Sequence, residues 1–238
     1  MTSPTEQSPP VAVVTGASRG LGRALAAGLA SRGWSLVLDA RGAEDLSAVH
    51  AGLPGGPHHA LAGDVTDPVH RTRLAAAADT LGGARVLVNN ASTLGRSPLP
   101  SFADLDAATY VEILRVNLVA PMALTAALLP QLRAHRGRVL NITSDASVEA
   151  YPTWGGYGSS KAALDHAGRV LAAEEPDLRV YAVDPGDMRT RMHQDAFPGE
   201  DISDRPEPEA VVPALLTLLD GDLPSGRYAA SALAQAVA

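Results

Sequence analysis

The sequence predicts one α/β domain built on a doubly wound parallel sheet. Short apolar runs alternate with helical patterns along the chain, no linker-like segment divides it, and 46% of its 238 residues are hydrophobic. Such alternation produces parallel strands with helices on both faces of the sheet. Right-handed crossovers then favour the strand order 3-2-1-4-5-6, extended here by a seventh strand. We therefore expect residues 11–238 to form a single domain.

The expected strands are short apolar runs bounded by turn residues. The first, Val11–Thr15, runs directly into a glycine-rich turn. The others are expected at Leu36–Leu38, Ala60–Asp64, Val86–Val88, Arg138–Thr143, Leu178–Val183 and Gly226–Ala229.

The expected helices show apolar residues at a spacing of three to four. Pro68 marks a helix start, because proline is favoured at the first helical position. Pro121 lies inside the longest helical pattern and predicts a kink or break between Asn117 and Pro121. The helices are expected at Leu21–Arg32, Pro68–Leu81, Leu105–Ala134, Gly158–Ala173 and Glu207–Leu219.

Composition excludes several classes of protein. Without cysteine there can be no disulfide framework, thiolate metal site or cysteine nucleophile. A net charge of −7 disfavours general nucleic-acid binding, and no histidine pair has metal-ligand spacing, so we expect no metal. Residues 1–10 are polar and proline-rich, which predicts a disordered tail rather than a signal peptide. The apolar stretch Leu118–Leu132 is too short and interrupted to span a membrane, which favours a cytoplasmic protein.

A glycine-rich turn, Thr15 to Gly22, follows the first strand and opens the first helix. Gly16 permits a tight turn, Gly20 permits close approach of a pyrophosphate, and Gly22 permits close packing of helix and strand. The helix N-terminus offers free N–H groups to phosphates. The turn therefore predicts a dinucleotide site on a Rossmann fold, although its spacing is T-G-x-x-x-G-x-G rather than the common G-x-G-x-x-G.

The charge at the end of the second strand bears on which nicotinamide cofactor binds. An acidic residue there would accept the 2′-hydroxyl of NAD, whereas arginines would bind the 2′-phosphate of NADP. The strand ends Asp39-Ala40-Arg41, and Arg19 lies in the glycine turn, so we expect NADP(H), with NAD less favoured. Asp39 should point to the opposite face of the strand, where it could pair with an arginine.

Tyr157 and Lys161 are spaced i, i+4, which places both side chains on one face of a helix. A nearby ammonium lowers the pKa of a tyrosine, so the pair could exchange a proton between a hydroxyl and a carbonyl. Ser144 ends the fifth strand at the edge where such folds bind ligands. Asn117 falls at the helix break, where a free backbone carbonyl could hold a water.

These motifs, taken together and in this order, make the chain resemble the short-chain dehydrogenase/reductase family from about Val11 to about Ala230. The resemblance implies that Asn117, Ser144, Tyr157 and Lys161 form a catalytic tetrad, with Tyr157 as the proton donor. It implies that Asp64 and Val65 contact adenine, that Asn90 lines the cofactor, and that Met188 and Thr190 contact the nicotinamide carboxamide. The expected cofactor-binding residues are Gly16, Ser18, Arg19, Gly20, Leu21, Gly22, Arg41, Asp64, Val65, Asn90, Tyr157, Lys161, Pro185, Gly186, Met188 and Thr190.

The expected activity is hydride transfer between NADP(H) and a small carbonyl or secondary alcohol. Two alternatives stay open: a non-catalytic NADP(H) sensor, and an epimerase or dehydratase on the same scaffold. The substrate itself is not predicted. It would be selected by a loop near residues 188–208, expected to be polar and without helix from Met192 to Pro208, and by an aromatic wall at Tyr151 and Trp154. The chain departs from the family at Ser92, where glycine is usual, and its carboxyl-terminal extension is short. A homodimer or homotetramer is expected.

Overall fold

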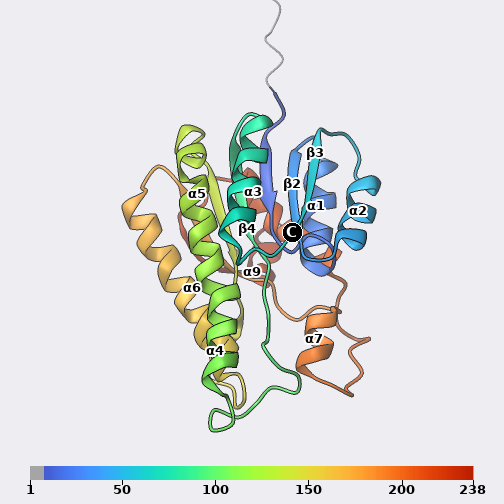
Figure 1. Cartoon of the computed structure of the whole chain (residues 1–238), viewed down its shortest axis with the longest axis vertical. Helices are drawn as coiled ribbons and strands as arrows, with labels where there is room; N and C mark the ends of the chain where they lie inside the picture. Colours follow the sequence, from blue (N-terminus) through green and yellow to red (C-terminus); the bar gives the residue numbers. More distant parts are fainter. Residues whose placement is uncertain (1–7, 238) are drawn as a thin grey trace, which may run out of the picture.

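The computed structural model describes residues 8–237 and contains a seven-stranded parallel sheet in the order β3-β2-β1-β4-β5-β6-β7 (Figure 1). This confirms the predicted fold class and strand order. Residues 1–7, most of the expected tail, lie outside the described part. The strands are β1 (Val11–Val14), β2 (Ser35–Ala40), β3 (His58–Ala62), β4 (Ala84–Asn89), β5 (Arg138–Ile142), β6 (Arg179–Asp184) and β7 (Gly226–Ala229).

Helices cover both faces of the sheet, which explains why its central strands are continuous apolar runs. In β1, Val11 and Val13 pack on one face against α3 and α5, while Ala12 and Val14 pack on the other against α1 and α8. The helices are α1 (Gly20–Ala30), α2 (Ala43–Gly52), α3 (Pro68–Thr80), α4 (Ala107–Leu114), α5 (Ala120–Ala134), α6 (Gly155–Glu174), α7 (Arg191–Ala196), α8 (Val212–Asp220) and α9 (Ala230–Val237).

Two helices were not predicted from the sequence, and one predicted loop is partly helical. Helix α2 buries only Leu46, so it lacks the apolar stripe that identifies a helix, and α9 follows β7 without an intervening turn signal. The predicted loop from Met192 to Pro208 begins inside α7, whose first turn is capped by Thr190 accepting a hydrogen bond from the His193 N–H. That expectation was therefore wrong over the first residues of the loop.

The long helical pattern breaks where predicted. Residues Arg115–Val119 form a π-helical turn between α4 and α5, and the Ala120 N–H bonds to the Arg115 carbonyl. Pro121 has no N–H to donate to the carbonyl of Asn117, four residues earlier, so the regular α-helical ladder cannot continue there. The break places Asn117 fully inside the protein.

The continuous helical stretch Ala107–Ala134 is long and apolar enough to cross a membrane by length and composition. Its apolar residues Leu124, Leu128 and Leu132 are fully buried against the sheet. We interpret it as a core helix of the α/β fold.

Candidate active site

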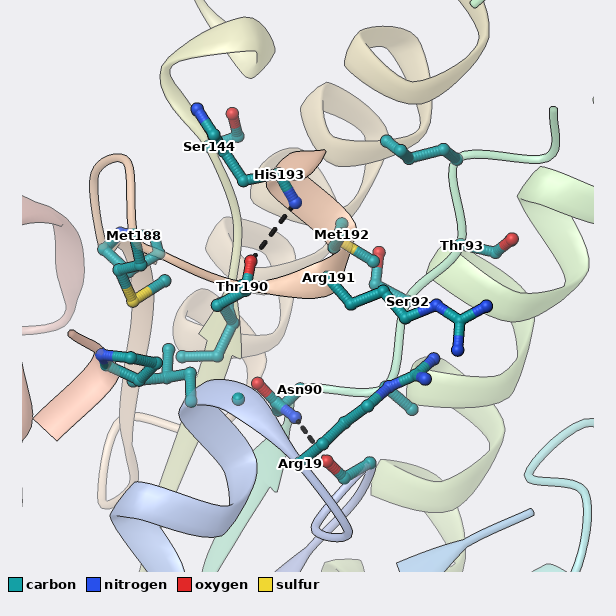
Figure 2. A pocket seen from close by; sticks show the side chains of 18 of the residues that line it. Arg19, Asn90, Ser92, Thr93, Ser144, Met188, Thr190, Arg191, Met192 and His193 are labelled. Atoms are coloured by element: carbon teal, nitrogen blue, oxygen red, sulfur yellow. Dashed lines mark hydrogen bonds between the residues drawn. The ribbon is translucent and has the colours of Figure 1, made fainter. Parts of the chain in front are cut away.

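A cleft of about 550 Å³ runs along the carboxyl edge of the sheet. This volume lies within the range of small-molecule and cofactor sites. Figure 2 shows Arg19 and Asn90 at one side of the cleft, with Thr190, Arg191, Met192 and His193 arranged above them. Every residue predicted to bind cofactor or act in catalysis lines this cleft except Gly22 and Asn117, which lie behind its wall.

The glycine turn has the shape expected of a phosphate site. Gly16 and Gly20 have φ angles of +65° and +53°, a region that favours glycine. A Cβ on Gly22 would stand 2.4 Å from the Gly16 carbonyl oxygen, so only glycine lets α1 pack this closely. No side chain caps α1, and its first N–H groups remain open toward the cleft.

Thr15 and Asn90 hold this turn against the neighbouring strand. The Asn90 amide donates to the carbonyl oxygens of Thr15 and Gly16 at 2.8 and 3.2 Å. The Thr15 hydroxyl accepts from the backbone N–H groups of Asn90 and Ala91, both at 3.0 Å. Asn90 thus shapes the turn in addition to lining the cleft (Figure 2).

Two exposed arginines, Arg19 and Arg41, line the cleft together with the carboxylate of Asp64. Arg19 and Arg41 both line the cleft, and within residues 8–237 neither has an ion-pair partner. Asp64 accepts a 2.8 Å hydrogen bond from the Thr66 N–H, and this bond holds the pKa of its carboxyl below the usual value. The two guanidinium groups are therefore available to an anion.

Asp39 is among the residues that line the cleft, but its side chain is buried on the face of β2 that α3 covers. Its partner is His70 and not an arginine: the Nε2 atom of His70 lies 2.6 Å from a carboxylate oxygen of Asp39. The expected arginine pairing was wrong because α3 places His70 against this face of β2.

Tyr157 and Lys161 lie on the first two turns of α6, both buried at the cleft floor. The Lys161 ammonium donates to the Ile142 carbonyl at 2.8 Å and lies 5.5 Å from the centre of the Tyr157 ring. Burial lowers the pKa of Lys161 to about 8, and Asp165 partly opposes this change. Burial raises the pKa of Tyr157, and hydrogen bonding with Ser92 offsets only part of the rise.

The expected lowering of the tyrosine pKa is therefore wrong for this chain: the pKa of Tyr157 is raised. The cause is desolvation, which disfavours the tyrosinate more than the hydrogen bond with Ser92 favours it, and the carboxylates of Asp145 and Asp184 add to the rise. The phenol is protonated at neutral pH.

Ser144 follows the end of β5, and its hydroxyl points toward the adjacent residue Asp145. It donates to a carboxylate oxygen of Asp145 at 2.8 Å and accepts from the Ala146 N–H at 3.2 Å. Arg227 on β7 fixes the backbone here by donating to the Ser144 carbonyl at 3.1 Å. Sequence reasoning missed Arg227 because it lies 83 residues away, on a strand with no motif.

Asn117 is held by bonds on both ends of its carboxamide. Its oxygen accepts from the Ser92 hydroxyl at 3.1 Å and from the Thr93 N–H at 2.8 Å. Its nitrogen donates to the Thr93 carbonyl at 2.9 Å and to the Ser160 hydroxyl at 3.0 Å. Ser92, the departure from the family pattern, thus links Asn117 with the Tyr157 hydroxyl.

An aromatic wall borders the cleft beside Tyr157. Trp154 contacts the Tyr157 ring, with centroids 5.6 Å apart, and Phe197 contacts both Trp154 and His193 at 5.8 and 4.9 Å. Trp154 was predicted for this role. Tyr151 instead donates to Asp145 at 3.0 Å. Phe197 and His193 carry no motif in the sequence, and only the position of their segment after the sixth strand points to them.

The fold is that of the short-chain dehydrogenase family, and the chain belongs to this family. The model of the short chain dehydrogenase family matches residues 10–201. The protein is therefore an oxidoreductase of that family.

Similar proteins carry the names of enzymes with different substrates. The chain is 38% identical to the sepiapterin reductase of Xenopus laevis over 197 residues, covering 76% of this chain and 74% of that protein. It is 35% identical to the serine 3-dehydrogenase of Agrobacterium fabrum over 186 residues, covering 76% and 72%. The crystal structure of an alcohol dehydrogenase from Thermococcus sibiricus, complexed with 5-hydroxy-NADP, superposes with a TM-score of 0.82 at 28% identity, covering 92% of this chain and 95% of that one.

Proposed function

We propose that this protein is an NADP(H)-dependent reductase of small carbonyl compounds, and the corresponding alcohol dehydrogenase in reverse. The observation that carries the proposal is that Tyr157, Lys161 and Ser144 line the same cleft as the open phosphate turn. The Tyr157 phenol, the Lys161 ammonium and the Ser144 hydroxyl would therefore lie next to a dinucleotide bound in this cleft. Bound NADPH would supply the hydride.

Tyr157 would donate the proton to the carbonyl oxygen. Its raised pKa keeps the phenol protonated, which suits a donor in the reduction. Ser144 would orient and polarise the carbonyl after its hydroxyl turns from Asp145 toward the substrate. Lys161 would hold the nicotinamide ribose and favour the tyrosinate left after proton transfer, and Asn117 would anchor the segment around Ser92 and Ser160 behind both groups.

The cofactor would lie along the length of the cleft. Its pyrophosphate would meet the N–H groups at Gly16–Gly22, and its adenine would lie by Asp64 and Val65. Arg19 and Arg41 would bind the 2′-phosphate, so NADP is proposed over NAD. Pro185, Gly186, Met188 and Thr190 would border the nicotinamide. The Thermococcus sibiricus structure, which contains 5-hydroxy-NADP, supports this choice.

The substrate would lie between Tyr157 and the wall of Trp154, Phe197 and His193. An apolar or ring-bearing carbonyl compound fits that surface, which supports a ketone or aldehyde of this kind. The two relatives are named as a reductase and a dehydrogenase, which is consistent with the proposed reaction type. Their names give different substrates, sepiapterin and serine.

We further propose a cytoplasmic homodimer or homotetramer. Exposed apolar side chains on α4, the π-helical turn and α5 support association of subunits: Val111, Val119 and Met122 are each at least half exposed. Sedimentation analysis of the purified protein tests the oligomeric state.

The activity is tested with purified protein, NADPH and a panel of aliphatic and aromatic ketones, following the absorbance of the reduced cofactor. We expect turnover of at least one ketone. Tight NADPH binding without turnover would instead favour the sensor, and product formation without net consumption of cofactor would favour the epimerase or dehydratase.

A further inference from the structure

Asp39 and His70 form a buried pair that the proposed chemistry does not use. Each residue is 2% exposed, and the Nε2 atom of His70 lies 2.6 Å from the carboxylate of Asp39. Burying two ionisable groups is costly unless they are paired and hydrogen-bonded. A pair retained at that cost beside the cleft calls for a physical reason.

The pair joins three chain segments that meet at the adenosine end of the cleft. The Asp39 carboxylate receives a backbone hydrogen bond from Gly16 in the phosphate turn. The Asp39 carbonyl accepts a hydrogen bond from the Ala17 N–H at 2.8 Å. Asp39 therefore contacts the phosphate turn through both its side chain and its backbone. Arg41, which lines the cleft, directly follows the last residue of β2.

His70 brings in the third segment, the end of β3. A Cβ on Gly63 would stand 2.3 Å from the His70 Nδ1 atom, so the imidazole rests directly on this glycine, next to Asp64. The Nδ1 atom is buried and, among the described residues, has no hydrogen-bond partner. When Nε2 carries the proton and donates a hydrogen bond to Asp39, Nδ1 is an acceptor without a donor among the described residues. The imidazole ring therefore makes its hydrogen bond to Asp39 alone.

The geometry points to Asp39 and His70 as a positioning pair that fixes the adenosine half of the cofactor site. Through one carboxylate it ties together the phosphate turn, the end of β2 that carries Arg41, and the Gly63–Asp64 segment. Of the two residues only Asp39 lines the cleft, and the pair acts on cofactor binding by holding these segments in place. It keeps these three segments in the binding arrangement before the cofactor arrives, which strengthens binding by reducing the ordering that binding requires.

This inference rests on the proposed use of NADPH, and it is tested by binding as well as by rate. His70→Leu removes the donor at similar volume, and His70→Gln keeps an N–H donor for Asp39. For His70→Leu we expect the Kd for NADPH, measured by calorimetry, and the KM for NADPH to rise about tenfold, as fits loss of a buried polar contact. We expect kcat at saturating NADPH to stay within about twofold of wild type, and His70→Gln to recover most of the affinity. The matched control is His166→Leu on the exposed face of α6, which should leave Kd unchanged.

A purely structural role would lower the melting temperature of His70→Leu while leaving its Kd for NADPH unchanged, and that result overturns the proposal. Should His70→Leu not fold, Asp39→Ala carries the same test, because it removes the acceptor for both His70 and Gly16 and leaves no unpaired buried charge, and wild-type affinity in that variant overturns the proposal equally. Calorimetry needs no turnover. If the wild-type protein binds NADPH but reduces no ketone, the proposed reductase activity fails while the pair is still judged by its effect on Kd. A wild-type protein that does not bind NADPH contradicts both.

Discussion

The Lys161 ammonium lies 5.5 Å from the centre of the Tyr157 ring and donates its hydrogen bond to the Ile142 carbonyl. Both residues are buried, at 2% and 8% exposure. Burial changes their pKa values in opposite directions, lowering that of Lys161 to about 8 and raising that of Tyr157. The site therefore combines a protonated phenol with an ammonium group whose pKa is about 8.

The first prediction concerns the pH dependence of ketone reduction. In the proposed mechanism the Lys161 ammonium would stabilise the tyrosinate formed by proton transfer, so its deprotonation would slow the reaction. We expect kcat for reduction to fall as the pH rises through about 8, the pKa of Lys161. A pH profile at saturating NADPH, with the Kd for NADPH measured in parallel, checks this. A rate that is flat from neutral pH to above pH 9, roughly one unit beyond that pKa, would contradict it.

The second prediction concerns stability. The unfolded chain holds its Lys161 proton up to about pH 10.5, whereas the folded chain releases it near 8, so the unfolded state binds more protons between these values. The Lys161 contribution to the unfolding free energy should therefore rise with pH, by roughly 2 kcal/mol between pH 8 and pH 10. Urea unfolding of wild type and Lys161→Met at both pH values measures this difference. Equal pH dependence in the two proteins would show that burial of Lys161 has no such cost.

The third prediction concerns the two arginines at the adenosine end. Arg41→Ala and Arg19→Ala would each remove a proposed charge-assisted hydrogen bond to the 2′-phosphate, a contact worth about 1.5–3 kcal/mol. We expect the KM for NADPH to rise about tenfold or more and the KM for NADH to change by no more than about twofold. Arg73→Ala, an exposed arginine outside the cleft, makes the same charge change and serves as the control. Equal effects on the two cofactors would exclude a 2′-phosphate contact.

The fourth prediction concerns the close packing of the phosphate turn. In Gly22→Ala the new methyl group would meet the Gly16 carbonyl oxygen at 2.4 Å, and backbone on both sides cannot yield cheaply. We expect a loss of about 1–3 kcal/mol in stability, typical of overpacking, together with weaker NADPH binding. Gly52→Ala at the end of α2 has nothing within 4 Å and should be neutral or stabilising. Thermal melts with and without NADPH compare the two, and similar behaviour would contradict the proposed packing role.

The sequence alone predicted the sheet order and the gathering of the motif residues in one cleft, because both follow from local patterns. The apolar strand segments, the glycine turn and the spacing of Tyr157 and Lys161 are each recognised from a few consecutive residues. The helix break at Asn117 followed in the same way from Pro121. These features depend little on distant parts of the chain.

The contacts that sequence could not predict join residues far apart in the chain. His70 meets Asp39 only once α3 packs on β2, and Arg227 reaches Ser144 from the last strand. The pKa of Tyr157 depends on desolvation, which is a property of the assembled core and not of the Tyr-x-x-x-Lys motif. Helix α2 was missed because it buries a single leucine.

The central claim is that Tyr157 donates the proton during NADPH-dependent carbonyl reduction. The most direct measurement compares wild type with Tyr157→Phe for NADPH oxidation by the best ketone of the panel, with the Kd for NADPH measured on both proteins. We predict that kcat falls by about 10²–10⁴-fold in Tyr157→Phe, the contribution typical of a general acid, while NADPH still binds. A Tyr157→Phe protein that binds NADPH and reduces the ketone at the wild-type rate would contradict it.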